Sequence, residues 1–86
     1  MKISIELTFT PLKDDYESHI IAFIKALRLS KFTVLENPLS TQIYGDYNKV
    51  MSFLQFEIEK AFSDLDVAVL QMKIVKTDRS DYEPYF

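Results

Sequence analysis

The stretch Asn-Pro-Leu-Ser-Thr-Gln-Ile-Tyr-Gly-Asp, residues 37–46, determines how the rest of the chain is organised. Asn37-Pro38 predicts a turn, because proline restricts its own backbone and that of the residue before it. Ser40 to Tyr44 then predicts a strand that runs antiparallel to the one before it. Gly45, the only glycine, is expected to give the backbone freedom at a strand-to-helix corner. Asp46 stands where the N-cap of a helix belongs.

Upstream of this stretch, the pattern predicts a strand, a helix and a second, short strand. Apolar and polar residues alternate over residues 3–10, which is the period of a half-buried strand; the apolar ones are Ile3, Ile5, Leu7 and Phe9. Asp14 or Asp15 is expected to cap a helix over residues 15–29, with Glu17 completing a capping box. The apolar stripe of that helix is Tyr16, Ile20, Phe23, Ile24 and Leu27. Residues 32–35 form a short β-prone run.

Downstream, a second amphipathic helix and a last strand are predicted. The helix runs from Tyr47 to Ser63-Asp64, and its apolar stripe is Tyr47, Val50, Met51, Leu54, Ile58, Ala61 and Phe62. Residues 67–75 form the last strand. The resulting β-α-β-β-α-β order predicts an α+β, ferredoxin-like sandwich, in which two helices cover one face of a four-stranded antiparallel sheet. The first and third strands are expected to be central.

The domain plan follows from this order and from the length. A chain of 86 residues has room for one domain, which we place at residues 1–76, with a C-terminal tail at 77–86. The expected core is Leu7, Phe23, Leu27, Ile43, Val50, Leu54, Ile58 and Leu70.

Composition excludes several classes of protein. There is no cysteine, so no disulfide framework and no Cys-based metal site is expected. The net charge of −3, without a basic stripe, argues against nucleic acid or a membrane as a partner. With no signal sequence and no membrane-spanning run, a cytoplasmic address is expected. We expect no enzyme, metal or cofactor: His19 is the only histidine and is predicted to lie on the solvated side of the first helix.

The helix-free face of the predicted sheet is mixed in character. Ser4, Glu6 and Thr8 should lie there with Ser40, Gln42 and Tyr44, beside several valines of the last strand. A fully solvated face would not be expected to carry those valines and a tyrosine. A partner sheet in a homodimer or higher homo-oligomer accounts for this. A ligand pocket at the same junction, with Glu6 as its charge, is the second interpretation.

Two segments resemble the YkoF-like family, which binds thiamin and its hydroxymethylpyrimidine moiety. Residues 6–12, Glu-Leu-Thr-Phe-Thr-Pro-Leu, with Tyr16 four residues on, resemble the opening strand-Pro-Leu-x-x-x-Tyr pattern of that family. Residues 39–47 are similar to its Met-Ser-Thr-Gln-Val-Phe-Gly-Glu-Tyr segment and are followed by Val50-Met51. The resemblance spans most of residues 2–75 and implies a non-enzymatic small-molecule binder. Founding members carry two such domains, so a site that needs both would need two chains here.

The chemistry of the candidate residues fits an aminopyrimidine cation. Glu6 can pair with the protonated ring nitrogen and the exocyclic amine, while Ser40, Thr41 and Gln42 can hydrogen-bond its edge. Tyr44 or Phe9 can offer a ring face, worth roughly 0.5–2 kcal/mol. Gln42 and Tyr44 are the expected neighbours of Glu6, and neither carries a positive charge. The cation that would pair with the Glu6 carboxylate could therefore be the ligand.

Each candidate residue also has a structural interpretation. Glu6 can simply be solvated, Thr41 can bond within the sheet, and Tyr44 can pack at a dimer seam. The alternative function is therefore a structural or regulatory oligomerisation module that binds another small metabolite or none.

Overall fold

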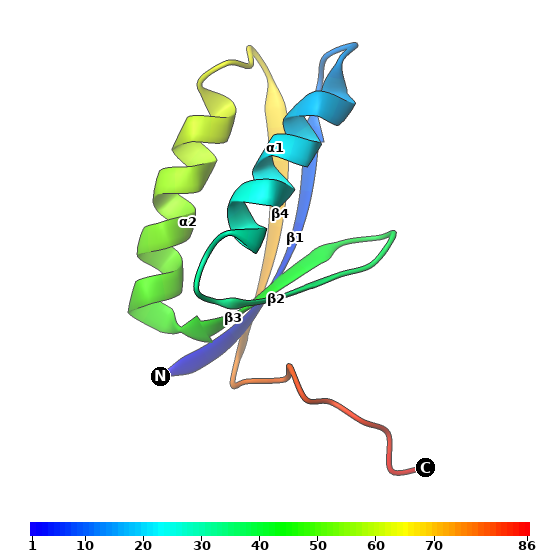
Figure 1. Ribbon diagram of the computed structural model, residues 1–86, viewed down its shortest axis with the longest axis vertical. Coiled ribbons are helices and arrows are strands. Elements are labelled where there is room, and N and C mark those ends of the chain that lie inside the picture. Colours follow the sequence, from blue (N-terminus) through cyan, green and yellow to red (C-terminus); the bar gives the residue numbers. More distant parts are fainter.

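The computed structural model describes residues 1–86 and shows the predicted α+β, ferredoxin-like sandwich (Figure 1). The elements in order are β1 (Lys2–Pro11), α1 (Tyr16–Arg28), β2 (Thr33–Glu36), β3 (Thr41–Asp46), α2 (Tyr47–Phe62) and β4 (Ala68–Lys76). All strand pairs are antiparallel and the sheet order is β2-β3-β1-β4. The prediction that the first and third strands are central is therefore confirmed.

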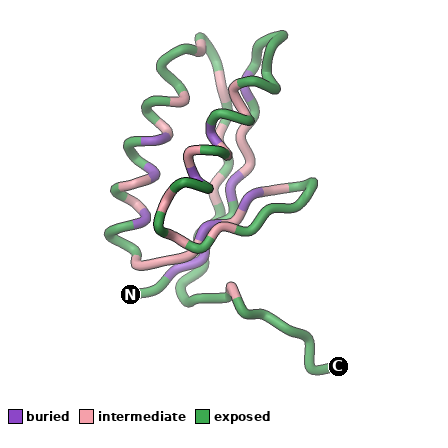
Figure 2. Tube along the Cα trace, viewed as in Figure 1, coloured by how far each residue is buried: buried purple, intermediate pink, exposed green.

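The core lies between the sheet and the two helices, as the alternation of β1 predicts. Ile3, Ile5 and Leu7 are buried, together with Phe23 and Leu27 of α1, Ile43 of β3, and Val50 and Leu54 of α2. In Figure 2 the buried positions, coloured purple, occur on both helices and on the sheet. Ile58 and Leu70, also expected in the core, are partly buried and pack against it.

The two helix starts differ in how they are capped. At α2 the N-cap prediction is confirmed, because the Asp46 carboxylate accepts a hydrogen bond from the Lys49 backbone N–H at 3.3 Å. At α1 the capping-box prediction is wrong, because Asp15 is the N-cap residue but its side chain makes no capping hydrogen bond. Its carboxylate lies instead 3.5 Å from His19 and 3.9 Å from Lys13.

Gly45 is required for a different reason from the one predicted. It does not have a positive φ, so the corner uses no conformation reserved for glycine. A Cβ at this position would lie 2.8 Å from side-chain atoms of both Phe32 and Val50. The absence of a side chain therefore lets the Phe32 ring and the start of α2 pack directly on the end of β3.

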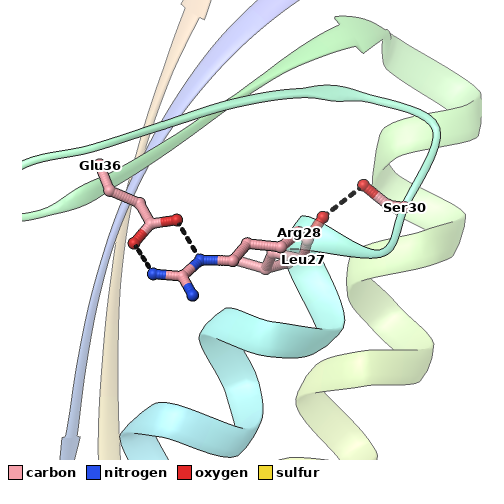
Figure 3. A network of polar contacts seen from close by, with 4 residues as sticks. All are labelled: Leu27, Arg28, Ser30 and Glu36. Atoms are coloured by element: carbon pink, nitrogen blue, oxygen red, sulfur yellow. Dashed lines mark hydrogen bonds and ion pairs between the residues drawn. The ribbon is translucent and has the colours of Figure 1, made fainter.

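An ion pair joins the end of α1 to the edge strand β2 (Figure 3). The Arg28 guanidinium donates two hydrogen bonds to the Glu36 carboxylate, at 2.6 and 2.7 Å, and these bonds lower the pKa of Glu36. The Ser30 hydroxyl donates a hydrogen bond to the Leu27 carbonyl at 2.6 Å, at the C-terminal end of α1. The Arg28–Glu36 ion pair thus links the end of α1 to β2 at one edge of the sheet.

Candidate functional site

Strand register brings the expected charged and polar residues into rows across the helix-free face. Glu6 pairs with Gln42 on one side and with Lys73 on the other. In the next row Ser4 lies between Tyr44 and Val75. Because alternate residues of a strand share a face, Glu6, Gln42 and Tyr44 are all on the side of the sheet away from the helices.

The Glu6 carboxylate is part of a small polar network. Its Oε2 accepts a hydrogen bond from the Ser40 hydroxyl at 3.1 Å, and that hydroxyl accepts another from the Gln42 amide at 2.8 Å. On its other side, Lys73 Nζ lies 3.9 Å from Glu6 Oε1. The prediction that Glu6 has no cationic neighbour is therefore wrong. The two side chains are 46% and 73% exposed, so this pair is weak and can be displaced.

The start of the C-terminal tail folds across the same face. The Ser4 hydroxyl donates to the Thr77 carbonyl at 2.7 Å and accepts from the Arg79 backbone N–H at 2.9 Å. This contact leaves Ser4 only 7% exposed. Thr77 has a φ of 141°, a strained value for a non-glycine residue. The chain thus turns sharply after β4 and passes over the Ser4 row, which the sequence pattern did not indicate.

These groups surround a hollow of about 180 Å³ on the helix-free face, here called the Glu6 hollow. Its lining includes Ser4, Glu6, Gln42, Tyr44, Lys73 and Arg79. Partial burial raises the pKa of Tyr44, and the negative charges of Asp78 and Glu6 raise it further. The Tyr44 phenol is therefore neutral and lies in a field that favours a cation beside it.

The remaining candidate residues border a second hollow, on the opposite face of the sheet. Phe9, Ser40 and Thr41 line this cavity of about 240 Å³ beneath α1, together with Phe23 and Leu39. The Phe9 ring packs against Phe23, with ring centroids 5.2 Å apart, so the structure does not bring Phe9 to Glu6. Ser40 lines this second cavity, and its hydroxyl bonds to Glu6 and Gln42, which line the Glu6 hollow.

His19 does not lie on a solvated helix surface, so that prediction is wrong. Its side chain is 18% exposed, and its buried Nε2 lies 3.5 Å from the Asp15 carboxylate without forming a hydrogen bond. Tyr16, at the predicted start of the apolar stripe of α1, is exposed. Neither hollow described above includes His19 in its lining.

Comparison with known proteins supports the fold. No family model matches the chain, and no curated protein does. A Streptococcus pneumoniae protein of known structure is 28% identical, with a TM-score of 0.83 over 91% of this chain and 89% of its own. A candidate thiamine biosynthesis/salvage protein from Thermotoga maritima is 16% identical, with a TM-score of 0.81 over 90% and 85%.

A third similar structure is a domain of unknown function, DUF77, from Bacillus cereus. It is 14% identical, with a TM-score of 0.75 over 90% of this chain and 77% of its own. These three structures share the fold over most of the chain. In the structure itself, neither helix has the length and apolar character needed to cross a membrane.

Proposed function

We propose that this protein is a non-enzymatic binder of thiamin or of its hydroxymethylpyrimidine moiety, held in the Glu6 hollow. The observation that carries the proposal is the convergence of Glu6, Gln42 and Tyr44 on one hollow, where the only ion pair of the Glu6 carboxylate is a 3.9 Å contact with the exposed Lys73. The name of the Thermotoga maritima protein supports the same ligand class.

The chemistry of recognition follows from the arrangement of these groups. The Glu6 carboxylate would accept two hydrogen bonds from the protonated aminopyrimidine and displace Lys73 from its 3.9 Å contact. Gln42 can rotate its amide toward the ring edge, since its present partner is the small Ser40 hydroxyl. The Ser4 hydroxyl is already used as donor and acceptor by the tail, so it is a structural group and no nucleophile in this proposal.

Calorimetric titration with three small molecules tests the proposed function. Thiamin and hydroxymethylpyrimidine should both bind the wild-type protein, because both carry the aminopyrimidine edge that Glu6 would recognise. Hydroxyethylthiazole, which is the other half of thiamin, is the matched control and should not bind measurably. Equal binding of all three compounds, or no binding of thiamin, would contradict the proposal and favour the oligomerisation module.

We further propose that two copies pair through the helix-free faces of their sheets. Leu35, Val69 and Val75 lie on this face and are exposed in the single chain. The Glu6 hollow, at about 180 Å³, is smaller than typical ligand pockets of ~300–1,000 Å³. A second sheet over this face would cover the valines and enclose the hollow, and would supply the second domain that founding members of the family carry in one chain.

Substitution of Val69 by glutamate tests this pairing. Val69 is 46% exposed and pairs with Thr10 on the helix-free face of the sheet. A charge at this position should weaken the assembly of two copies by at least about tenfold, which is equivalent to ~1.4 kcal/mol. Light scattering over a concentration series measures the effect, and circular dichroism should show both helices intact. Leu29→Glu, at the exposed end of α1, is the matched control and should assemble like wild type. A wild-type monomer at high micromolar concentration would disprove the pairing.

A further inference from the structure

A third hollow gathers positive charge beside the Glu6 hollow. It has a volume of about 310 Å³ and lies where β3 meets α2. Its lining includes Lys2, Lys31, Lys49, Tyr44, Asp46 and Asp78. Three of the eight lysines of a chain with net charge −3 are therefore placed around one cavity. We call this cavity the lysine hollow.

The charges around the lysine hollow are not balanced. None of its three lysine ammonium groups forms an ion pair with a carboxylate. Its two carboxylates are already engaged. Asp46 accepts from the Lys49 backbone N–H and pairs with the N-terminal ammonium group, each at 3.3 Å. Asp78 accepts from the Ser80 backbone N–H at 2.9 Å and from its hydroxyl at 2.6 Å. An anion in the hollow would therefore find three ammonium groups that are not held in ion pairs, one of which, Lys31, lies 5.9 Å from the centroid of the Phe32 ring.

We propose that the lysine hollow is a phosphate-binding subsite, and that with the Glu6 hollow it binds a phosphorylated form of thiamin. The second part rests on the proposed function. Lysine ammonium groups bind phosphate as point charges, and three of them around one cavity can each contribute.

The spacing of the two hollows fits such a ligand. Tyr44 lines both of them, and it pairs with Ser4, halfway along β1 between Glu6 and Lys2. Glu6 and Lys2 are four residue steps apart along β1, which is roughly 13–14 Å. In thiamin monophosphate a positively charged thiazolium ring and a two-carbon chain separate the pyrimidine from the phosphate. The thiazolium would then lie over the Tyr44 ring, where cation–π attraction favours it.

Calorimetry with thiamin, thiamin monophosphate and inorganic phosphate tests the subsite. Wild type should bind thiamin monophosphate about tenfold or more tightly than thiamin at low salt, and added salt should reduce this difference. The double variant Lys31→Gln/Lys49→Gln should lose the difference and keep its affinity for thiamin. Lys13→Gln/Lys25→Gln removes the same charge from residues that do not line either hollow, so it should behave as wild type.

The outcomes separate this inference from the proposed function. Thiamin binding without any gain from the phosphate, and without binding of inorganic phosphate, would overturn the subsite and leave the proposed function in place. Binding of inorganic phosphate that requires Lys31 and Lys49, in a protein that does not bind thiamin, would support the subsite and overturn the proposed ligand. A lack of binding by all three compounds would overturn both.

Discussion

Replacement of Leu54 by alanine is expected to lower the free energy of unfolding by about 2–5 kcal/mol. Leu54 is 0% exposed and belongs to the core between α2 and the sheet. Its truncation removes buried apolar surface and leaves a cavity whose walls are strands of a hydrogen-bonded sheet, so the site cannot easily collapse. Urea titration followed by circular dichroism measures the change.

Gln55→Ala is the matched control for this substitution. Gln55 is the next residue of α2 and is exposed, so its truncation should change the free energy of unfolding by less than about 0.5 kcal/mol. A loss for Leu54→Ala no larger than that of Gln55→Ala would contradict the packing of α2 described here.

Replacement of Glu6 by glutamine is expected to weaken thiamin binding by about 1.5–3 kcal/mol, the range for hydrogen bonds to charged groups. Glutamine keeps the shape of the side chain but removes its charge and one acceptor. The substitution also removes the ion pair between Glu6 and Lys73 in the unliganded protein. Both groups are exposed, so this pair contributes at most ~1 kcal/mol to the free energy of unfolding, and the fold should survive. Titration calorimetry of both proteins with thiamin gives the difference.

Lys73→Gln is the informative control, because it removes the group that competes with the ligand for Glu6. Thiamin should bind this variant as well as it binds wild type, or more tightly. If Glu6→Gln and wild type bind thiamin equally, Glu6 is not the anchor. If Lys73→Gln loses binding instead, Lys73 and not Glu6 contacts the ligand.

Local periodicity was sufficient to predict the fold. Alternation predicts that one face of β1 is buried, the face of Ile3, Ile5 and Leu7. Helical spacing predicts that one side of α2 is buried, the side of Val50 and Leu54. The structure buries both. The role of Gly45 was not predictable in this way. It depends on Phe32, which approaches from another element, so only tertiary packing reveals the close contact.

The candidate site was harder to predict, because it depends on register across strands that are distant in sequence. Gln42 and Tyr44 were placed correctly on the helix-free face from alternation alone. Lys73 lies opposite Glu6 because of the register in which β1 pairs with β4. The pattern of polar residues alone does not determine that register. The contact of Ser4 with Thr77 and Arg79 was also missed, since no periodic signal marks where an irregular tail will lie.

The central position of β1 has a consequence for how the chain folds. Its two hydrogen-bonding partners are β3 and β4, and the β4 pairing joins Ile3 to Lys76 and Pro11 to Ala68. Contacts between such distant residues form only after long loops have closed, which costs conformational entropy. Folding should therefore be slower than in a helical bundle of the same size. Until β4 docks, one edge of an aliphatic strand presents unpaired N–H and C=O groups to other chains. Refolding should therefore compete with aggregation, and dilute conditions will favour the native fold over misassembled chains.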